Sequence, residues 1–315
     1  MNTTPQAPPF AWLRMPALSP RALGLLAVLM FAMTIPMTRL ANGHGQHLQF
    51  PPLFVALGRS ALAALAAGFY LWWVRAPWPP RSVWLCLLGV VLGAVLMFPA
   101  CMGWAVRHVP AWHASVITGV LPFLTAALAA WWLGHRPRLG FWLAGGVGMS
   151  LVLCFAWLAS KGAAGESAGA LSVPDVVLLV GMLGGAVAYV SGARAAQHLP
   201  SAQVMSWAVV WALPITLPGA LLAWWSAPEA SLSAIDVSSW LALAYVSLVS
   251  SWLGFFAWYA ALAQDAMRVS QMQLLQPFAA MGLSALLLGE QVSPLAPVFA
   301  CGVAAAVWVG QKHMR

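Results

Sequence analysis

Two long apolar segments of the chain each carry a row of polar side chains that ends in a proline. The rows share the spacing i, i+3, i+7 and consist of Ser115, Thr118 and Pro122 in one segment and Ser270, Gln273 and Pro277 in the other. In a helix, residues at this spacing lie on one face. Hydroxyl and amide groups donate and accept hydrogen bonds, so these faces are suited to binding a polar solute.

The two prolines favour this interpretation because each disturbs the backbone hydrogen bonds of its own helix. A proline inside a helix frees the carbonyl four residues earlier, at a cost of about 3 kcal/mol in a soluble helix. Here the freed carbonyls belong to Thr118 and Gln273. Within a membrane, such a group must be satisfied by protein, water or solute. We therefore expect both helices to line a central cavity; the alternative is two kinked helices whose polar residues bond to neighbouring helices.

Four further residues are candidate solute contacts because of their place in the apolar segments. Gln276 directly precedes a proline, and Tyr189 lies deep in its segment. Trp104 and Tyr259 lie near segment ends, where aromatic side chains either anchor a helix at the membrane interface or contact a solute.

Arg59 and His113 are candidates because of their charge. Arg59 lies about 10 Å along its segment at 1.5 Å per residue. Its side chain either reaches back to the membrane surface or binds a carboxylate or phosphate. His113 is either a polar helix-end residue or a group that titrates near neutral pH.

The elements that must position these side chains are membrane helices. The chain has 315 residues, of which 62% are hydrophobic and 6% charged, and its mean hydropathy is +0.85. A soluble domain needs roughly a quarter of its residues charged. With about 20 apolar residues per crossing, the sequence predicts an all-α membrane protein of ten transmembrane helices: 21–40, 52–74, 81–104, 110–133, 139–159, 173–196, 202–225, 238–262, 267–289 and 293–311.

The basic residues predict the orientation of these helices. With an even number of crossings and the N-terminus inside, ten of the 14 Lys and Arg residues fall on the cytoplasmic side and three on the other, while Arg59 lies within a helix. Excess positive charge marks the cytoplasmic side. We therefore expect a multi-pass protein of the inner (plasma) membrane with both termini in the cytoplasm. The net charge of +8 then belongs to helix ends, and no nucleic-acid partner is expected.

The sequence also contains an internal repeat. A shift of 155 positions places residues 98–152 on residues 253–307 without a gap, and it brings Pro122 onto Pro277 and Arg39 onto Arg194. Each copy holds five predicted helices, an odd number, so the second copy would enter the membrane from the opposite side. The sequence thus predicts two inverted five-helix repeats, residues 21–160 and 173–311, after a flexible tail of residues 1–20. Inverted repeats are a recurrent architecture of secondary transporters, with the substrate bound between the repeats.

The segments "LPFLTAALAAWWLG" and "QPFAAMGLSALLLGE" resemble the two EamA domains of ten-helix members of the drug/metabolite transporter superfamily. The shared features are a helix with a central Pro-Phe, a closing Leu-Gly-Glu and a glycine-rich last helix. In the first copy, His135 stands in the place of Glu290. The resemblance implies transport of small metabolites, often amino acids or related compounds, and commonly export.

Together these features predict a secondary transporter, an exporter of small metabolites such as amino acids by alternating access. Its pathway is expected between the first, third and fourth helices of one half and the sixth, eighth and ninth of the other. The alternatives are an exporter of drugs or other hydrophobic compounds, a membrane sensor that transports nothing, and a lipid-modifying enzyme, which would need His and acidic residues clustered at one interface. No catalytic residue, metal or cofactor is expected. The expected partners are a small-molecule substrate and the lipid bilayer. The sequence predicts no particular oligomeric state.

Overall fold

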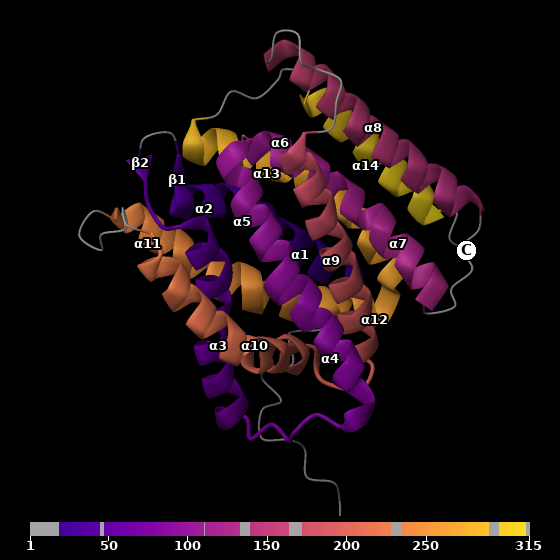
Figure 1. Cartoon of the computed structure of the whole chain (residues 1–315). Helices are drawn as coiled ribbons and strands as arrows, with labels where there is room; N and C mark the ends of the chain where they lie inside the picture. The colour runs from indigo at the N-terminus through magenta and orange to yellow at the C-terminus, as the bar shows by residue number, and fades with distance from the viewer. Residues whose placement is uncertain are drawn as a thin grey trace, which may run out of the picture.

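The computed structural model describes residues 19–44, 47–109, 111–132, 139–163, 172–227, 235–289 and 296–312. Its α-helices are α1 (Pro20–Ala32), α2 (Thr34–Asn42), α3 (Pro52–Trp73), α4 (Trp84–Val90), α5 (Phe98–His108), α6 (Ala111–Ile117), α7 (Leu121–Trp132), α8 (Leu139–Ala163), α9 (Val173–Ala195), α10 (Ser201–Trp225), α11 (Val237–Ala244), α12 (Gly254–Met272), α13 (Gln276–Leu288) and α14 (Ala296–Lys312). Two strands of two residues each, β1 (Gly43–His44) and β2 (His47–Leu48), pair antiparallel beside α2. The fold is thus a helical bundle with one short β-ladder (Figure 1).

Helical structure is present within each of the ten predicted ranges. Among the described residues, seven helical stretches are long and apolar enough to cross a membrane: Pro20–Asn42, Pro52–Trp73, Arg81–His108, His113–Trp132, Val173–Ala195, Ser201–Trp225 and Val237–Asp265. Large apolar side chains also cover the outer surface, including Trp72, Leu85, Trp131 and Leu286. A water-facing surface of this kind would drive association, whereas lipid tails accommodate it. The chain is therefore a multi-pass membrane protein, and its ten crossings stay a prediction.

The predicted helix breaks occur at both prolines. The 3₁₀ turn η4 (Thr118–Val120) separates α6 from α7, and the 3₁₀ turn η7 (Gln273–Leu275) separates α12 from α13. Each turn begins at the residue whose carbonyl a proline was expected to free, and Pro122 or Pro277 is the second residue of the helix that follows. A proline is tolerated in the first helical turn because its missing N–H has no partner to lose there.

A second irregularity also recurs at the repeat offset. The π-helix η3 (Val91–Met97) joins α4 to α5, and the π-helix η6 (Tyr245–Leu253) joins α11 to α12. A shift of 155 positions places η3 on residues 246–252, which lie within η6. Wide turns of this type occur frequently at functional sites, and both π-helices contribute residues to the cavity described below.

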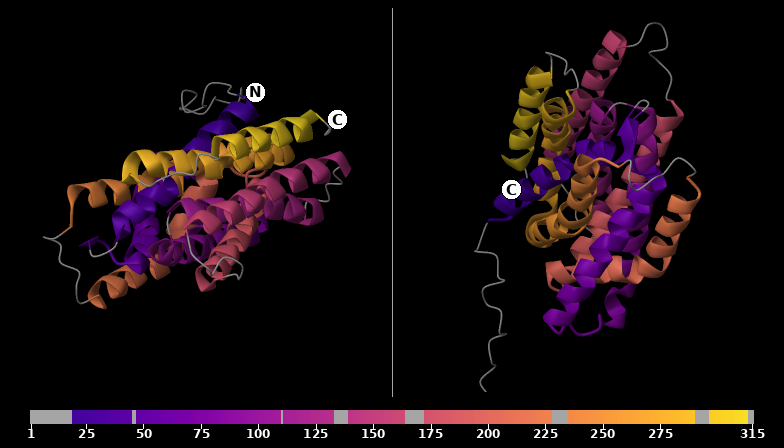
Figure 2. Two further views of the ribbon diagram at one scale, coloured as in Figure 1. Left: turned by 90° about the horizontal axis from the view of Figure 1, so that it is seen from above. Right: turned by 90° about the vertical axis from the view of Figure 1, so that its left-hand side faces the viewer.

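Helices from the two sequence copies pack against each other rather than forming separate bundles. α3 packs along α10 and α1 along α12, while α9 lies against α4, η3, α5 and α7. α8 and α14 lie side by side at one edge of the bundle (Figures 1 and 2). The central helices of both copies are therefore in position to build one shared site.

Small residues permit the close contact between η3 and α9. A methyl group added at Gly93 would overlap the backbone carbonyl of Gly184. The other glycine-rich segment, in α8, behaves differently, since a methyl group at Gly145 or Gly146 would meet no described atom within 4 Å. Close packing thus depends on the glycines in η3 and α9 and not on these two in α8.

α13 ends just before a glycine, as its sequence indicates. Gly289 has φ of 65°, and its N–H donates to the carbonyl oxygen of Ala285. This left-handed conformation favours glycine, which explains the position of the Gly after the last leucine. Glu290, His135 and residues 1–18 of the predicted tail lie outside the described residues.

Candidate functional site

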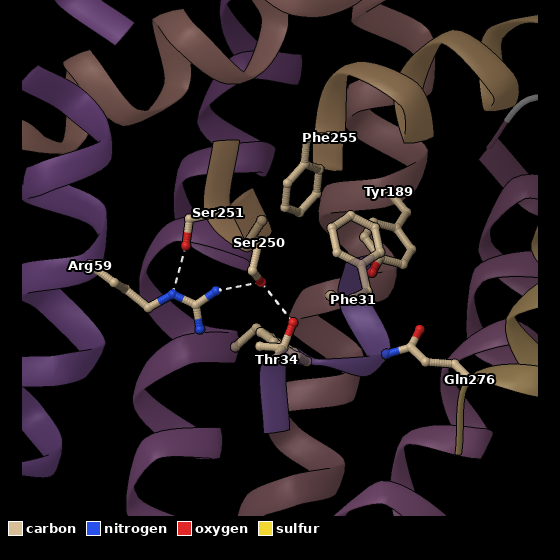
Figure 3. Close-up of a pocket in the computed structure, with 11 residues that line it drawn as sticks. Phe31, Thr34, Arg59, Tyr189, Ser250, Ser251, Phe255 and Gln276 are labelled. Atoms are coloured by element: carbon tan, nitrogen blue, oxygen red, sulfur yellow. Dashed lines mark hydrogen bonds between the residues drawn. The ribbon is translucent and has the colours of Figure 1, made fainter. Parts of the chain in front are cut away.

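A cavity lies in the middle of the bundle, between helices of both sequence copies (Figure 3). Its volume is about 30 Å³, room for only a few water molecules, so a solute of amino-acid size would enter only after the surrounding helices move apart. The lining combines one cation, several hydroxyls, an amide and aromatic rings. The residues concerned are Phe31, Thr34, Arg59, Ala94, Phe98, Gly185, Tyr189, Ser250, Ser251, Phe255 and Gln276.

Arg59 enters this cavity from the middle of α3. Its Nε donates to the Oγ of Ser251 over 2.6 Å, and its Nη2 donates to the Oγ of Ser250 over 3.0 Å. Ser250 also shares a hydrogen bond of 2.7 Å with Thr34. Both serines belong to η6, so the π-helix presents two consecutive hydroxyls to one guanidinium (Figure 3). The network fixes the orientation of the guanidinium plane.

The charge of Arg59 is held in the interior. Only 4% of the residue is exposed, so its side chain does not reach back to the membrane surface. No acidic residue lines the cavity, and Arg59 forms no ion pair within the described part of the chain. At the repeat offset its counterpart is Pro214, which carries no charge. Neutral hydroxyls orient a cation but cannot neutralise it, and a buried unpaired charge is costly.

Opposite the cation lies an aromatic wall. The ring centroids of Phe31 and Phe255 are 5.0 Å apart, those of Tyr189 and Phe255 are 6.1 Å apart, and Phe31 stacks on Tyr189 at 6.5 Å. Gln276 comes from the start of α13 and directs its amide toward the space between this wall and Thr34 (Figure 3). The cavity thus has a charged end and an apolar end.

The glutamines preceding the proline of α13 differ in their placement. Gln276 lines the cavity, whereas Gln271 and Gln273 do not. Both of the latter are buried, and their amide oxygens and nitrogens lack hydrogen-bond partners in the described part of the chain. The Gln273 amide lies near the Tyr189 hydroxyl without hydrogen-bond geometry. Gln273 is therefore buried outside the cavity lining and carries unused hydrogen-bonding capacity among the described residues.

The polar row of the fourth helical segment bonds to its own backbone. Ser115 donates to the carbonyl of Ala111 over 2.7 Å, and Thr118 donates to that of Ser115 over 2.5 Å. Both residues and Pro122 are buried, and none of them lines the cavity. Ser270 and Pro277 are likewise buried outside the cavity lining. The two predicted rows thus lie in the interior, but only the second segment reaches the cavity, through Gln276.

Trp104 and Tyr259 occupy contrasting positions. Trp104 is 39% exposed and its ring stacks near that of His108 at 4.0 Å, away from the cavity. Tyr259 is fully buried, and its hydroxyl donates to the carbonyl of Ala188 over 3.3 Å. Its ring centroid lies 5.2 Å from that of Phe255, so it packs, fully buried, against a residue of the aromatic wall rather than anchoring a helix at the membrane interface.

His113 takes part in a polar pair between α6 and α9. Its Nε2 lies 2.7 Å from Oδ1 of Asp175. The other carboxylate oxygen, Oδ2, accepts from the backbone N–H and the hydroxyl of Ser172, which completes a capping box at the start of α9. The pattern Ser-x-x-Asp before an apolar run signals such a cap, but nothing in the sequence points to its histidine partner.

Sequence reasoning missed Ser250 and Ser251 as partners of Arg59, and Thr34 as the partner of Ser250. One signal was available, because a cation inside a membrane helix requires acceptors and consecutive serines in an apolar segment can supply them. Thr34 had a second signal, since the 155-residue offset brings it onto Tyr189, and both residues line the cavity. No group of three or more metal-binding side chains occurs in the described ranges.

The chain is similar to known transporters over most of its length. It is 37% identical over 270 residues to the "Uncharacterized transporter YdeK" of Bacillus subtilis (strain 168), covering 85% of this chain and 88% of that protein. It is 27% identical over 300 residues to the "Probable amino-acid metabolite efflux pump" of Salmonella typhimurium (strain LT2), covering 93% and 95% of the two chains.

A solved crystal structure has a similar fold, with a TM-score of 0.68, 16% sequence identity, and coverage of 94% of this chain and 97% of the other. The EamA-like transporter family matches the sequence twice, at residues 20–159 and at residues 173–309. These two matches span most of the chain and include the helices that line the cavity. The protein therefore belongs to the EamA-like transporter family, as the resemblance of its two repeats implies.

Proposed function

We propose that the protein is a secondary transporter that exports small metabolites, such as amino acids, by alternating access. The observation that carries this proposal is the cavity, which is built jointly by α1, α2, α3, η3 and α5 of the first sequence copy and α9, η6, α12 and α13 of the second. A site made by both halves can face alternate sides of the membrane when the halves move relative to each other.

The proposal includes ten crossings arranged as two inverted five-helix repeats. Three observations support it: the family matches twice, the sequence aligns with itself at an offset of 155 positions, and both the π-helices and the 3₁₀ turns recur at that offset. The basic residues favour a protein of the plasma membrane with both termini in the cytoplasm.

The cargo is proposed to contact Arg59, Tyr189 and Gln276 directly. Gln273 and Tyr259 would act from outside the cavity lining, and the breaks at Pro122 and Pro277 would let the fourth and ninth helices bend. Amino acids are the first choice of cargo, supported by the name of the Salmonella relative. Hydrophobic compounds are the second choice, favoured by the aromatic wall of Phe31, Tyr189 and Phe255.

Counterflow into proteoliposomes tests this function. Vesicles containing the purified protein would be preloaded with one member of a panel of amino acids, nucleosides and cationic drugs, and uptake of the same labelled solute would be measured. We expect amino-acid counterflow by the wild type and at least a tenfold loss with Gln276→Ala, because one hydrogen bond and part of the cavity lining are removed. Gln197→Ala, a change at an exposed glutamine, provides the matched control and should keep the wild-type rate.

Absence of counterflow for every solute in protein that remains folded would contradict the transport proposal. Counterflow of amino acids that is equally fast in wild type and Gln276→Ala would retain the transport function but remove Gln276 from the pathway.

A further inference from the structure

We infer that Arg59, held by Ser250, Ser251 and Thr34, is a subsite for the carboxylate of the cargo, and that the cargo class is small monocarboxylates with an apolar side chain, including zwitterionic amino acids. This inference rests on the proposed function, since it takes the cavity to be the transport site. It specifies which end of the cargo is recognised and which cargoes are excluded.

The first step of the argument is the unused bonding capacity of the guanidinium. An arginine offers N–H groups in a planar fork that matches a carboxylate. In Arg59, Nε and one N–H of Nη2 are occupied by serine hydroxyls. Nη1 and the second N–H of Nη2 have no partner among the described residues. The serines therefore hold the fork in place and leave part of it available to a ligand.

The second step is the charge of the cavity. Arg59 is the one charged residue in the described lining, so the cavity carries a single positive charge. A ligand with one negative charge neutralises it. A phosphate ester with two negative charges would leave a surplus, and a cationic drug would add a second positive charge to a poorly solvated space. Charge balance thus favours a monocarboxylate; a zwitterion places its carboxylate on Arg59 but leaves the net charge unchanged, so its ammonium needs neutral acceptors in the lining.

The third step is the arrangement of the remaining lining. The aromatic wall of Phe31, Tyr189 and Phe255 would hold an apolar side chain when the carboxylate lies on Arg59. An amino group, where the cargo has one, would find an acceptor in the Thr34 hydroxyl, and a second in the Gln276 amide oxygen after that amide turns, since its nitrogen faces this space in Figure 3. Both polar groups line the cavity between its charged and apolar ends (Figure 3). Once the helices open, a zwitterion and a simple carboxylate would therefore both find matching groups in this lining.

Direct binding to the purified full-length protein tests this subsite. The probes are leucine, methionine and phenylalanine, each compared with its primary amide and with the corresponding acid that lacks the amino group. Dissociation constants would be measured by calorimetry in detergent, and counterflow of the same compounds in proteoliposomes. The wild type should bind at least one amino acid and its deaminated acid about tenfold or more tightly than the amide, as expected for a charge-assisted hydrogen-bonded pair.

Three variants test whether the preference for carboxylates over amides depends on Arg59. Arg59→Gln should abolish the preference for the carboxylate over the amide, while Ser251→Ala, which keeps the charge but removes one orienting hydroxyl, should weaken carboxylate binding several-fold. Ser251→Ala also serves if Arg59→Gln does not fold. Arg194→Gln removes an exposed arginine of α9 and should leave every dissociation constant unchanged.

The possible outcomes separate the subsite from the transport function. If no carboxylate binds to the wild type more tightly than its amide, or if folded Arg59→Gln keeps the preference, the subsite is wrong even where counterflow is observed. If the carboxylates bind through Arg59 but no solute shows counterflow, the subsite is supported and the transport proposal fails.

Discussion

Arg59 and Asp175 show two ways in which a charged side chain is held within an apolar bundle. Asp175 is surrounded by donors, since His113 approaches one carboxylate oxygen and Ser172 donates twice to the other. Among the described residues, the partners of Arg59 are neutral hydroxyls. The acid is thus satisfied by the protein itself, as expected of a structural residue, whereas the cation retains capacity for a ligand.

Asp175→Ala should therefore reduce stability rather than recognition. The substitution removes the capping box of α9 and the partner of His113, which together are worth about 2 kcal/mol or more. We expect a fall of several degrees in the melting temperature of the purified protein, measured by a thermal unfolding assay in detergent. Amino-acid binding, measured below that temperature, should be retained.

Asp236→Ala is the matched control for this change. Asp236 also lies at the start of a helix, as the N-cap residue of α11 where Asp175 is the third residue of α9, but its side chain makes no capping hydrogen bond. Its substitution should leave the melting temperature within about one degree of wild type, since an exposed residue of this kind contributes within roughly 0.5 kcal/mol. Equal losses from Asp175→Ala and Asp236→Ala would show that the His113 pair and the cap add no stability.

Individual residues were predictable when their own chemistry was unusual for their segment. A cation, a glutamine beside a proline and a deep tyrosine all stood out, and Arg59, Gln276 and Tyr189 do line the cavity. The partners of Arg59 did not stand out because they lie 191 and 192 positions away in the sequence. Which faces of two distant helices meet is determined by tertiary packing, and no local spacing encodes it.

At the scale of the helices, the proline-linked breaks could be predicted and the π-helices could not. Proline removes a donor and displaces a carbonyl by its covalent structure, so η4 and η7 follow from the sequence directly. η3 is followed by Pro99, the second residue of α5, whereas η6 neither contains a proline nor precedes one at the start of α12, so proline does not account for both π-helices. Their recurrence at the repeat offset indicates that packing shared by both halves sustains them.

The contact between η3 and α9 makes Gly93→Ala a test of packing between the halves. The added methyl group would overlap the carbonyl oxygen of Gly184, and a backbone atom cannot rotate away as a flexible side chain could. Overpacking of this kind costs about 1–3 kcal/mol. We expect a lower melting temperature and slower counterflow, measured in the same assays.

Gly145→Ala is the comparison variant for Gly93→Ala, because Gly145 lies inside the helix α8. A methyl group there meets no described atom within 4 Å, and alanine has a higher helix propensity than glycine by up to about 1 kcal/mol. Stability should be unchanged or slightly raised. If Gly93→Ala were as stable and active as Gly145→Ala, close approach of η3 to α9 would not be required.

At the scale of the whole molecule, the proposed topology can be tested with reporter fusions. An odd number of crossings in the first repeat places its end opposite the C-terminus. Alkaline phosphatase, which is active only outside the cytoplasm, should be active when fused after residue 165 and inactive when fused after residue 315. A fluorescent protein that matures only in the cytoplasm should give the reverse pattern. Equal signals from one reporter at both sites would rule out inverted five-helix repeats.

Composition was sufficient to identify the class of the molecule, and self-alignment was sufficient to find the two copies. The family matches agree with both conclusions. How the copies interleave could not be predicted. The pathway was expected to use the fourth predicted helix, which contains α6 and α7. The described lining instead includes α3, from the second predicted helix, and no residue of α6 or α7. No sequence pattern predicted that α8 and α14 lie side by side.

The lone guanidinium has a further consequence for a molecule built from two similar halves. Because Arg59 is matched by Pro214, the cavity does not share the approximate two-fold symmetry that the proposed inverted repeats would have. Its cation, its aromatic wall and its Gln276 amide are three chemically different groups at three corners. A molecule and its mirror image cannot satisfy three such groups in the same way, so the protein should distinguish L-amino acids from their D-enantiomers.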